Sequence, residues 1–162
     1  MAKEIKLTQG KVAIVDDEMY DYLNQWKWFA NKQKNDKFYV GRRILVSNKK
    51  QSTIWMHRFI MNPKKGMVID HLDGNPLNNQ KNNLRICTQS ENLRNRNCNI
   101  NNTSGFKGVY WHKITKKWMS YITINKKSLY LGIYTNPIKA AFAYNEAAIK
   151  YHGKFANINK ID

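Results

Sequence analysis

The first third of the chain alternates between short apolar runs and polar turns, a pattern typical of strands. The runs KVAIV and KFYVGRRILV combine β-branched with aromatic residues, which favours strands. Between them, DDEMYDYLNQWKWFA can form a helix of one turn or more, with Trp26, Trp28 and Phe29 packing in a core. Residues 1–55 are therefore predicted to form a β-rich region.

The pattern changes over residues 56–98. The apolar segment MHRFIM leads through a Pro-Lys-Lys-Gly turn into a strand predicted at about 67–72. An Asn-rich loop then separates this strand from a short second one, LRIC. Thr88 and Glu91 fit a capping box, so we expect a helix to begin near Gln89. The predicted order is strand, long loop, strand, helix.

Residues 104–162 follow a polar segment, 99–103, that is predicted to be a linker. Three strand-like segments precede a helix that starts at Asn136-Pro137, because Asn caps helices and Pro suits the first helical position. Gly153 is placed to end it. The predicted apolar face of this helix consists of Ile138, Ala141, Phe142, Ala148 and Ile149. The predicted fold class is therefore α+β, ending in a three-stranded antiparallel sheet packed on one helix.

The charge balance adds the first functional clue. The chain has 28 Lys and Arg against 11 Asp and Glu, a net charge of +17 over 162 residues. A field of this size favours a polyanionic partner, because each neutralised phosphate releases counterions. A solubility surface rarely needs this excess, and no long basic amphipathic helix favours an anionic membrane. Nucleic acid is the partner that the composition favours.

Composition also excludes several classes of protein. Apolar residues make up 42% of the chain, which is enough for packed cores. No run of about 18 apolar residues and no apolar signal core is present, so we expect neither a membrane span nor a secretory signal. Cys87 and Cys98 are too few for a disulfide framework or a structural zinc site. We therefore expect a cytoplasmic protein without structural zinc.

The stretch IDHLDGNPLNNQKNNLR gathers one imidazole with carboxylates and many amides. Hydrolysis of a phosphodiester needs a base that works near neutral pH and a cation that offsets charge on the phosphate. Asp70 and His71 are neighbours on the predicted strand, so their side chains point to opposite faces. Carboxylate and amide oxygens suit Mg²⁺, and Asn92 on the following helix can supply a second ligand.

These residues resemble a known family. The matching positions are Asp70-His71, Asn83 and Asn92, with DGN after the histidine and NNLR around the middle Asn. Over about residues 54–97 they resemble the HNH endonucleases, most closely the phage and intron-associated homing branch. The resemblance implies a ββα-metal nuclease core in which His71 is the general base and Asn83 orients it. It also implies that Asp70 and Asn92 hold one divalent metal. Asn92 replaces a histidine of the founding pattern, so Mg²⁺ or Mn²⁺ is expected rather than Zn²⁺.

Other residues of this part receive simpler interpretations. Arg85 is expected to touch a phosphate. His57 can contact a phosphate or pack inside the fold, and the sequence leaves both interpretations open. The remaining loop amides are expected to be turn formers: Asn75, Asn78, Asn79 and Asn82. With one active site per chain, the resemblance implies that a monomer nicks DNA and leaves a 5′-phosphate and a 3′-hydroxyl.

The C-terminal part resembles the plant ethylene-response-factor DNA-binding domain of the Apetala-two type. The matching pieces are GFKGVYWH, KKWMSYI, YLGIYTNPIKAAFAYNEAAIKYHG and FANIN. The resemblance implies a sheet that enters the major groove of double-stranded DNA with the helix behind it. The positions that align with DNA contacts are Lys107, Tyr110, His112, Lys117, Trp118, Tyr121, Thr123 and Tyr130. Several contact arginines are replaced here, so phosphate and methyl contacts are expected instead of guanine contacts. For Trp118, packing on the sheet is the alternative.

The predicted organisation has four parts: a β-rich region at 1–55 with DNA contact, a nuclease core at 56–98, a linker at 99–103 and a DNA-binding domain at 104–162. Two other functions remain open. A non-catalytic DNA-binding regulator would keep Asp70 and His71 as relics, but the intact motif argues against it. An RNA-binding or ribosome-associated protein would fit the charge, but the second resemblance is to a reader of duplex DNA.

Overall fold

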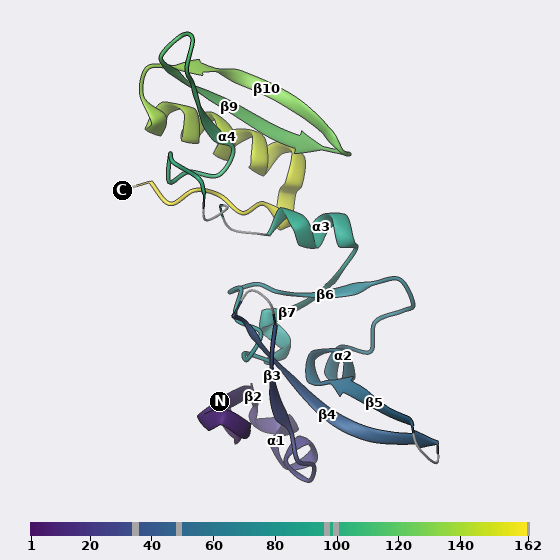
Figure 1. Cartoon of the computed structure of the whole chain (residues 1–162). Coiled ribbons are helices and arrows are strands. Elements are labelled where there is room, and N and C mark those ends of the chain that lie inside the picture. Colours follow the sequence, from purple (N-terminus) through teal and green to yellow (C-terminus); the bar gives the residue numbers. More distant parts are fainter. Residues whose placement is uncertain (34–35, 48–49, 96–97, 99–100, 162) are drawn as a thin grey trace. The chain divides into compact units, whose positions relative to one another are not determined.

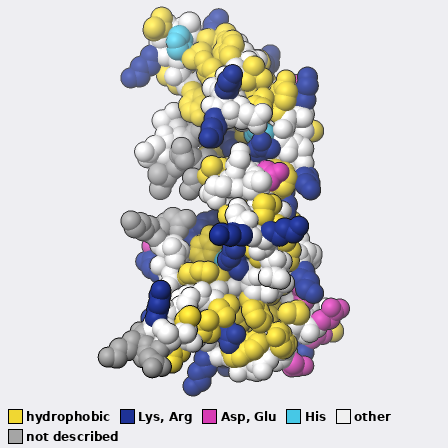
Figure 2. Space-filling model, turned by 90° about the vertical axis from the view of Figure 1, so that its right-hand side faces the viewer, with side chains coloured by type: hydrophobic (Ala, Val, Ile, Leu, Met, Phe, Trp, Pro, Cys, Tyr) yellow, Lys and Arg dark blue, Asp and Glu magenta, His cyan; other side chains and the backbone are white. Residues whose placement is uncertain are grey.

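The structure is a computed structural model that describes residues 1–33, 36–47, 50–95, 98 and 101–161. The chain divides into two compact units, Met1–Gln89 and Ser90–Asp162. Their elements are drawn in Figure 1. Figure 2 shows Lys and Arg side chains on the visible surface of both units, in keeping with the net charge of +17.

The first unit is built from short strands and helices. Its strands are β1 (Ala2–Lys6), β2 (Val12–Asp16), β3 (Phe29–Lys32), β4 (Phe38–Ser47), β5 (Lys50–Trp55), β6 (Val68–His71) and β7 (Leu84–Cys87). Its helices are α1 (Asp17–Asn24) and α2 (Met56–Met61), with 3-10 turns η1 (Thr8–Gly10) and η2 (Lys81–Asn83). The strands pair as three antiparallel sheets: β1–β2, β3–β4–β5 and β6–β7. The strands predicted at KVAIV, KFYVGRRILV and LRIC are confirmed, and so is the helix between the first two.

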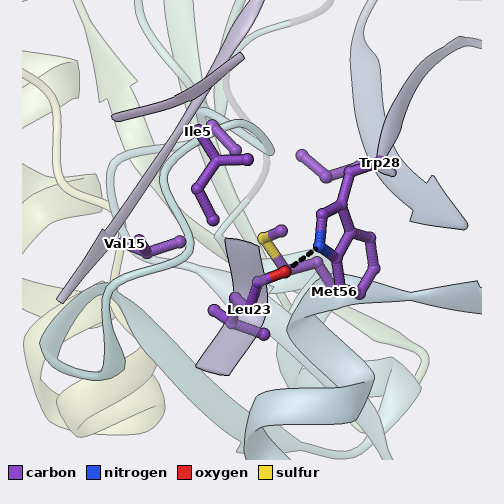
Figure 3. Packing of buried hydrophobic residues seen from close by; sticks show 7 residues of the cluster. Ile5, Val15, Leu23, Trp28 and Met56 are labelled. Atoms are coloured by element: carbon purple, nitrogen blue, oxygen red, sulfur yellow. Dashed lines mark hydrogen bonds between the residues drawn. The ribbon is translucent and has the colours of Figure 1, made fainter. Parts of the chain in front are cut away.

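One apolar core holds the first unit together. Figure 3 shows Ile5, Val15, Leu23, Trp28 and Met56 packed against one another. The indole N–H of Trp28 donates to the backbone oxygen of Leu23 at 2.8 Å, so the polar edge of this buried ring is satisfied. Each aliphatic side chain buried this way contributes about 1.5–3 kcal/mol. Because Met56 shares this core, the predicted parts 1–55 and 56–98 pack together, and the division between them stays a prediction.

The second unit contains one sheet and one long helix. Its elements are β8 (Val109–His112), β9 (Lys117–Ile124), β10 (Lys127–Tyr134), α4 (Pro137–His152) and the 3-10 turn η3 (Gly153–Phe155), preceded by α3 (Gln89–Arg94) at the junction of the units. The sheet is antiparallel in the order β10–β9–β8. Figure 1 shows α4 running along one face of it. In the part of the chain that the structure describes, no helix is long and apolar enough to cross a membrane.

Both ends of α4 follow the sequence signals. The Asn136 side-chain oxygen accepts the N–H of Ile138 at 2.8 Å, and Gly153 takes the left-handed region at φ 52° where the helix ends. The predicted apolar face is partly wrong, because Phe142 is 54% exposed and Ile149 is 61% exposed. Ile138 is exposed too. The buried face is Ala140, Ala141, Tyr144, Ala147 and Ala148. Small alanines let the helix lie close to the sheet, which the larger side chains do not allow.

Candidate active site

The candidate site is built on the β6–β7 hairpin. In its antiparallel register Asp70 lies opposite Arg85, and His71 lies opposite Leu84. The strand predicted at 67–72 is observed as Val68–His71, and the helix predicted near Gln89 begins there. The hairpin thus fixes two chemically distinct side chains next to each other, both of them buried.

The loop between β6 and β7 is closed by side-chain hydrogen bonds around Asp73. One carboxylate oxygen accepts the backbone N–H of Asn75 at 2.8 Å and the amide of Asn83 at 3.0 Å. The other accepts the amide of Asn78 at 2.9 Å. Burial raises the pKa of Asp73, but these hydrogen bonds and the nearby His71 outweigh it and lower that pKa. The turn-forming role predicted for the loop amides is confirmed for Asn75 and Asn78.

Asn83 is the most heavily used of these amides. Its side-chain oxygen accepts the N–H of Asp73 at 3.1 Å, and its nitrogen also donates to the backbone oxygen of Asn78 at 2.9 Å. Its own backbone oxygen accepts the N–H of Leu72 at 2.9 Å. The side chain is 7% exposed. These contacts hold the loop directly beyond His71, which supports a bracing role; that Asn83 orients His71 stays a prediction.

His71 lies in an aromatic cluster. Its ring centroid is 5.3 Å from that of His57 and 6.1 Å from that of Tyr39, and both rings meet it edge to face. Burial lowers the pKa of His71, and this effect outweighs the opposing influence of Asp73 and of the Asn79 side chain. The imidazole is therefore held in its neutral form near pH 7.

The structure answers the open question about His57, because this side chain is buried and packs against His71. Burial lowers its pKa to about 3, with His71 and Arg58 adding to the effect. Among the described residues its Nδ1 has no hydrogen-bond partner. Sequence reasoning did not connect His57 with the site, although a histidine inside the apolar segment WMHRFIM was a signal of burial.

Asp70 forms an ion pair with the guanidinium of Arg85 on the neighbouring strand. The carboxylate side chain is 6% exposed and the arginine side chain 16% exposed, so the pair is largely shielded from water. The phosphate contact predicted for Arg85 stays a prediction. A buried carboxylate oxygen is a hard donor of the kind that suits Mg²⁺ or Mn²⁺.

The second predicted metal ligand comes from a different unit. Asn92 lies on α3 and belongs to Ser90–Asp162, whereas Asp70 belongs to Met1–Gln89. The pairing of these two ligands therefore stays a prediction. Within the described residues, no group of three or more His, Cys, Asp or Glu side chains is placed to hold a metal.

The residues predicted to contact DNA divide between the two sides of the second unit. Side chains alternate along β9, and Ile122 packs on α4, so the register places the following residues on the outer face: Tyr110, His112, Lys117, Tyr121, Thr123 and Tyr130. Trp118 lies on the helix side, 4.9 Å from the ring of Trp111, which supports the packing interpretation. Lys107 is half-buried, and its ammonium donates to the backbone oxygen of Arg94.

Comparison with known proteins places the hairpin in a recognised class. The HNH endonuclease family matches residues 49–94. This segment contains β6, β7 and nearly all of α3. The chain thus contains an HNH endonuclease domain, and this class of enzyme binds and cuts DNA.

Three individual proteins are similar to parts or most of the chain. Protein 3.8 of Escherichia phage T7 is 44% identical over 63 residues, covering 39% of this chain and 52% of that protein. An uncharacterized HNH endonuclease of Acanthamoeba polyphaga mimivirus is 29% identical over 167 residues, covering 95% of this chain and 78% of that protein. An APETALA2-like protein of Oryza sativa subsp. indica is 40% identical over 57 residues, covering 35% of this chain and 13% of that protein. The chain therefore spans only about half the length of the T7 protein.

Proposed function

We propose that this chain is a metal-dependent, site-specific DNA endonuclease of the homing type that nicks one strand of duplex DNA at each active site. The observation that carries this proposal is the buried Asp70–His71 pair on β6, inside the segment that matches the HNH endonuclease family. The viral relatives support an origin in a phage or a similar mobile element.

His71 is the proposed general base. In its neutral form an imidazole nitrogen takes a proton from water, and the water oxygen attacks the phosphorus. The bond from phosphorus to the 3′-oxygen then breaks, and protonation of that oxygen leaves a 3′-hydroxyl and a 5′-phosphate. The lowered pKa of His71 supports this role, because it keeps the imidazole able to accept a proton near neutral pH.

Asp70 and Asn92 are the proposed ligands of one divalent cation, Mg²⁺ or Mn²⁺. When bound, such a cation offsets negative charge on the scissile phosphate. Asp70 supplies the hard carboxylate oxygen that this chemistry needs. Arg85 pairs with the same carboxylate and holds it in place on the hairpin, so we expect it to position Asp70.

The second unit is proposed to bind double-stranded DNA with the outer face of its sheet. Its support is the partial likeness to the rice protein and the outward placement of six of the eight predicted contact residues. A nuclease unit joined to a DNA-binding unit suits a site-specific enzyme, and we propose that it acts as a monomer.

The test is nicking of supercoiled plasmid and phage DNA by the full chain with Mg²⁺, with Mg²⁺ plus EDTA, and by the His71→Ala variant. We expect relaxed circles only with the unmodified chain and free Mg²⁺. A chain that shifts DNA on a gel but leaves every candidate target intact would instead be a non-catalytic regulator. Cleavage by His71→Ala at the original rate would remove His71 from its proposed role.

A further inference from the structure

The outer face of the β8–β10 sheet carries a row of aromatic and apolar side chains across its middle. Every strand contributes, and the residues are Tyr110 on β8, Met119 and Tyr121 on β9, and Tyr130 and Ile133 on β10. The cross-strand register joins Tyr121 to Tyr130, and Met119 to both Tyr110 and Ile133. We call these five side chains the tyrosine belt.

The belt is packed within itself yet open to solvent. The ring centroid of Tyr121 is 6.4 Å from that of Tyr110 and 5.3 Å from that of Tyr130. Tyr110 is 56% exposed and Tyr130 is 50% exposed. The hydroxyl of Tyr121 is directed at the Met119 sulfur, 3.6 Å away, so this polar group is turned into the belt. The surface on offer is therefore mainly rings and apolar edges.

Positive charge stands at both ends of the belt. The exposed lysines of the β8–β9 turn and the start of β9 are Lys113, Lys116 and Lys117, and those of the β9–β10 turn and the start of β10 are Lys126 and Lys127. The eight residues of β9 span roughly 25 Å between these groups. The major groove of B-DNA is about 12 Å wide and admits a β-ribbon. Lysines at both ends can thus reach the phosphates that border the groove, while the belt faces the bases.

We propose that the tyrosine belt reads the 5-methyl groups of thymine in the major groove. This inference rests on the proposed function only in taking duplex DNA as the ligand of the second unit. The belt contains no Arg, Lys, Asn, Gln, Asp or Glu, the side chains that read base edges by bidentate or charged hydrogen bonds. The thymine methyl is the groove feature that apolar side chains contact. The belt therefore confers a preference for thymine-rich sites, and the lysines supply affinity without sequence preference.

The first test removes only the methyl groups. Binding of the full chain is measured in EDTA, so that no cleavage occurs, on random-sequence duplexes prepared with thymidine or with deoxyuridine. Burying one methyl is worth about a fourfold change in affinity, so we expect at least that preference for the thymidine duplexes. Equal affinity for both pools overturns the proposal. Tighter binding to single strands than to duplexes overturns it too, because it would make the belt a stacking surface for unpaired bases.

The second test adds methyl groups at the same position of the groove. Duplexes prepared with 5-methylcytosine in place of cytosine carry a methyl where cytosine has none. We expect these to bind more tightly than unmodified duplexes of the same sequences. A lower or unchanged affinity contradicts a belt that recognises methyl groups.

The variant Tyr130→Ser should reduce the thymidine preference toward one while the chain still binds duplex DNA. The matched control is Phe142→Ser, which removes a similarly exposed ring from α4. We expect this control to keep the full preference, and a loss of preference in it contradicts the proposal. The tests on unmodified protein do not depend on the folding of any variant. They also separate the two proposals, since methyl preference can persist without nicking and nicking without methyl preference.

Discussion

At the scale of single residues, His57 is the side chain whose importance changed most. It packs edge to face on His71 and so limits the positions that the proposed base can take. We predict that His57→Ala lowers the nicking rate by about tenfold to a hundredfold at saturating DNA, because small displacements of catalytic groups cost this much. The affinity for DNA should be unchanged. His57→Phe, which keeps a ring at this position, should retain much of the rate. Equal loss in both variants would show that the ring contact is not what matters.

The same residue predicts a pH dependence of stability. The pKa of His57 is about 3 when folded and about 6.5 in an unfolded chain, so the unfolded state binds the extra proton first. Stability is fully present above about pH 6.5 and falls as the pH drops toward 3. Between about pH 7 and pH 5 this residue should remove about 2 kcal/mol from the free energy of unfolding. Denaturant unfolding of His57→Phe should show that much less pH dependence, and identical curves would contradict the prediction.

Asn83 and Asn82 are neighbours in η2 and form a matched pair. Asn83 is buried and makes three side-chain hydrogen bonds, whereas Asn82 is exposed. We predict that Asn83→Ala lowers the free energy of unfolding by about 2–4 kcal/mol and abolishes nicking, because it leaves buried partners unsatisfied. Asn82→Ala should change stability by less than about 0.5 kcal/mol and keep activity. Thermal melts and the nicking assay measure both effects, and similar losses would rule out a bracing role.

At the scale of elements, Gly108 controls how closely β8 approaches α4. It has φ +76°, and a Cβ there would lie 2.1 Å from the ring of Tyr144 and 2.6 Å from the backbone oxygen of Tyr121. Gly105 has nearly the same φ, +75°, but a Cβ there would meet nothing within 4 Å. The two glycines therefore separate the cost of the backbone conformation from the cost of the collision.

We predict that Gly105→Ala costs about 1–2 kcal/mol, the price of the left-handed backbone alone. Gly108→Ala should cost at least about 2 kcal/mol more, because Tyr144 has to leave its packed position. Differential scanning calorimetry should show the larger loss in the transition of the second unit. Equal destabilisation by the two substitutions would mean that α4 and the sheet can move apart freely.

At the scale of the whole molecule, the net charge of +17 governs affinity more than any single contact. We predict that binding to duplex DNA of any sequence weakens by about 10³-fold or more between 50 and 200 mM salt, because bound lysines and arginines release counterions from the phosphates. Lys117→Ala should lower the slope of log affinity against log salt by about one, while Glu146→Ala should leave the slope unchanged. Titrations at four or more salt concentrations measure the slope, and a flat dependence would exclude phosphate as the main partner.

Much of the fold could be predicted because its signals are local. The Asn136-Pro137 start, the Gly153 end and the apolar runs of the strands depend on residues a few positions apart. The α4 face was harder, since Phe142 and Ile149 are as apolar as any core residue. What the sheet leaves room for decides which face is buried, and that depends on side chains from three strands.

The sequence by itself determined the charge, the order of the elements, and the identity of Asp70, His71 and Asn83 as chemically useful groups, because residue type and spacing carry this information directly. Only the tertiary structure decided that His57 lies against His71 and that Arg85 pairs with Asp70. It also separated the outer face of the β8–β10 sheet from the helix side, which turns scattered tyrosines into one belt. The physical reason is the same in each case: strand pairing and burial bring together side chains that the sequence keeps many residues apart, and their contacts then set pKa, exposure and function.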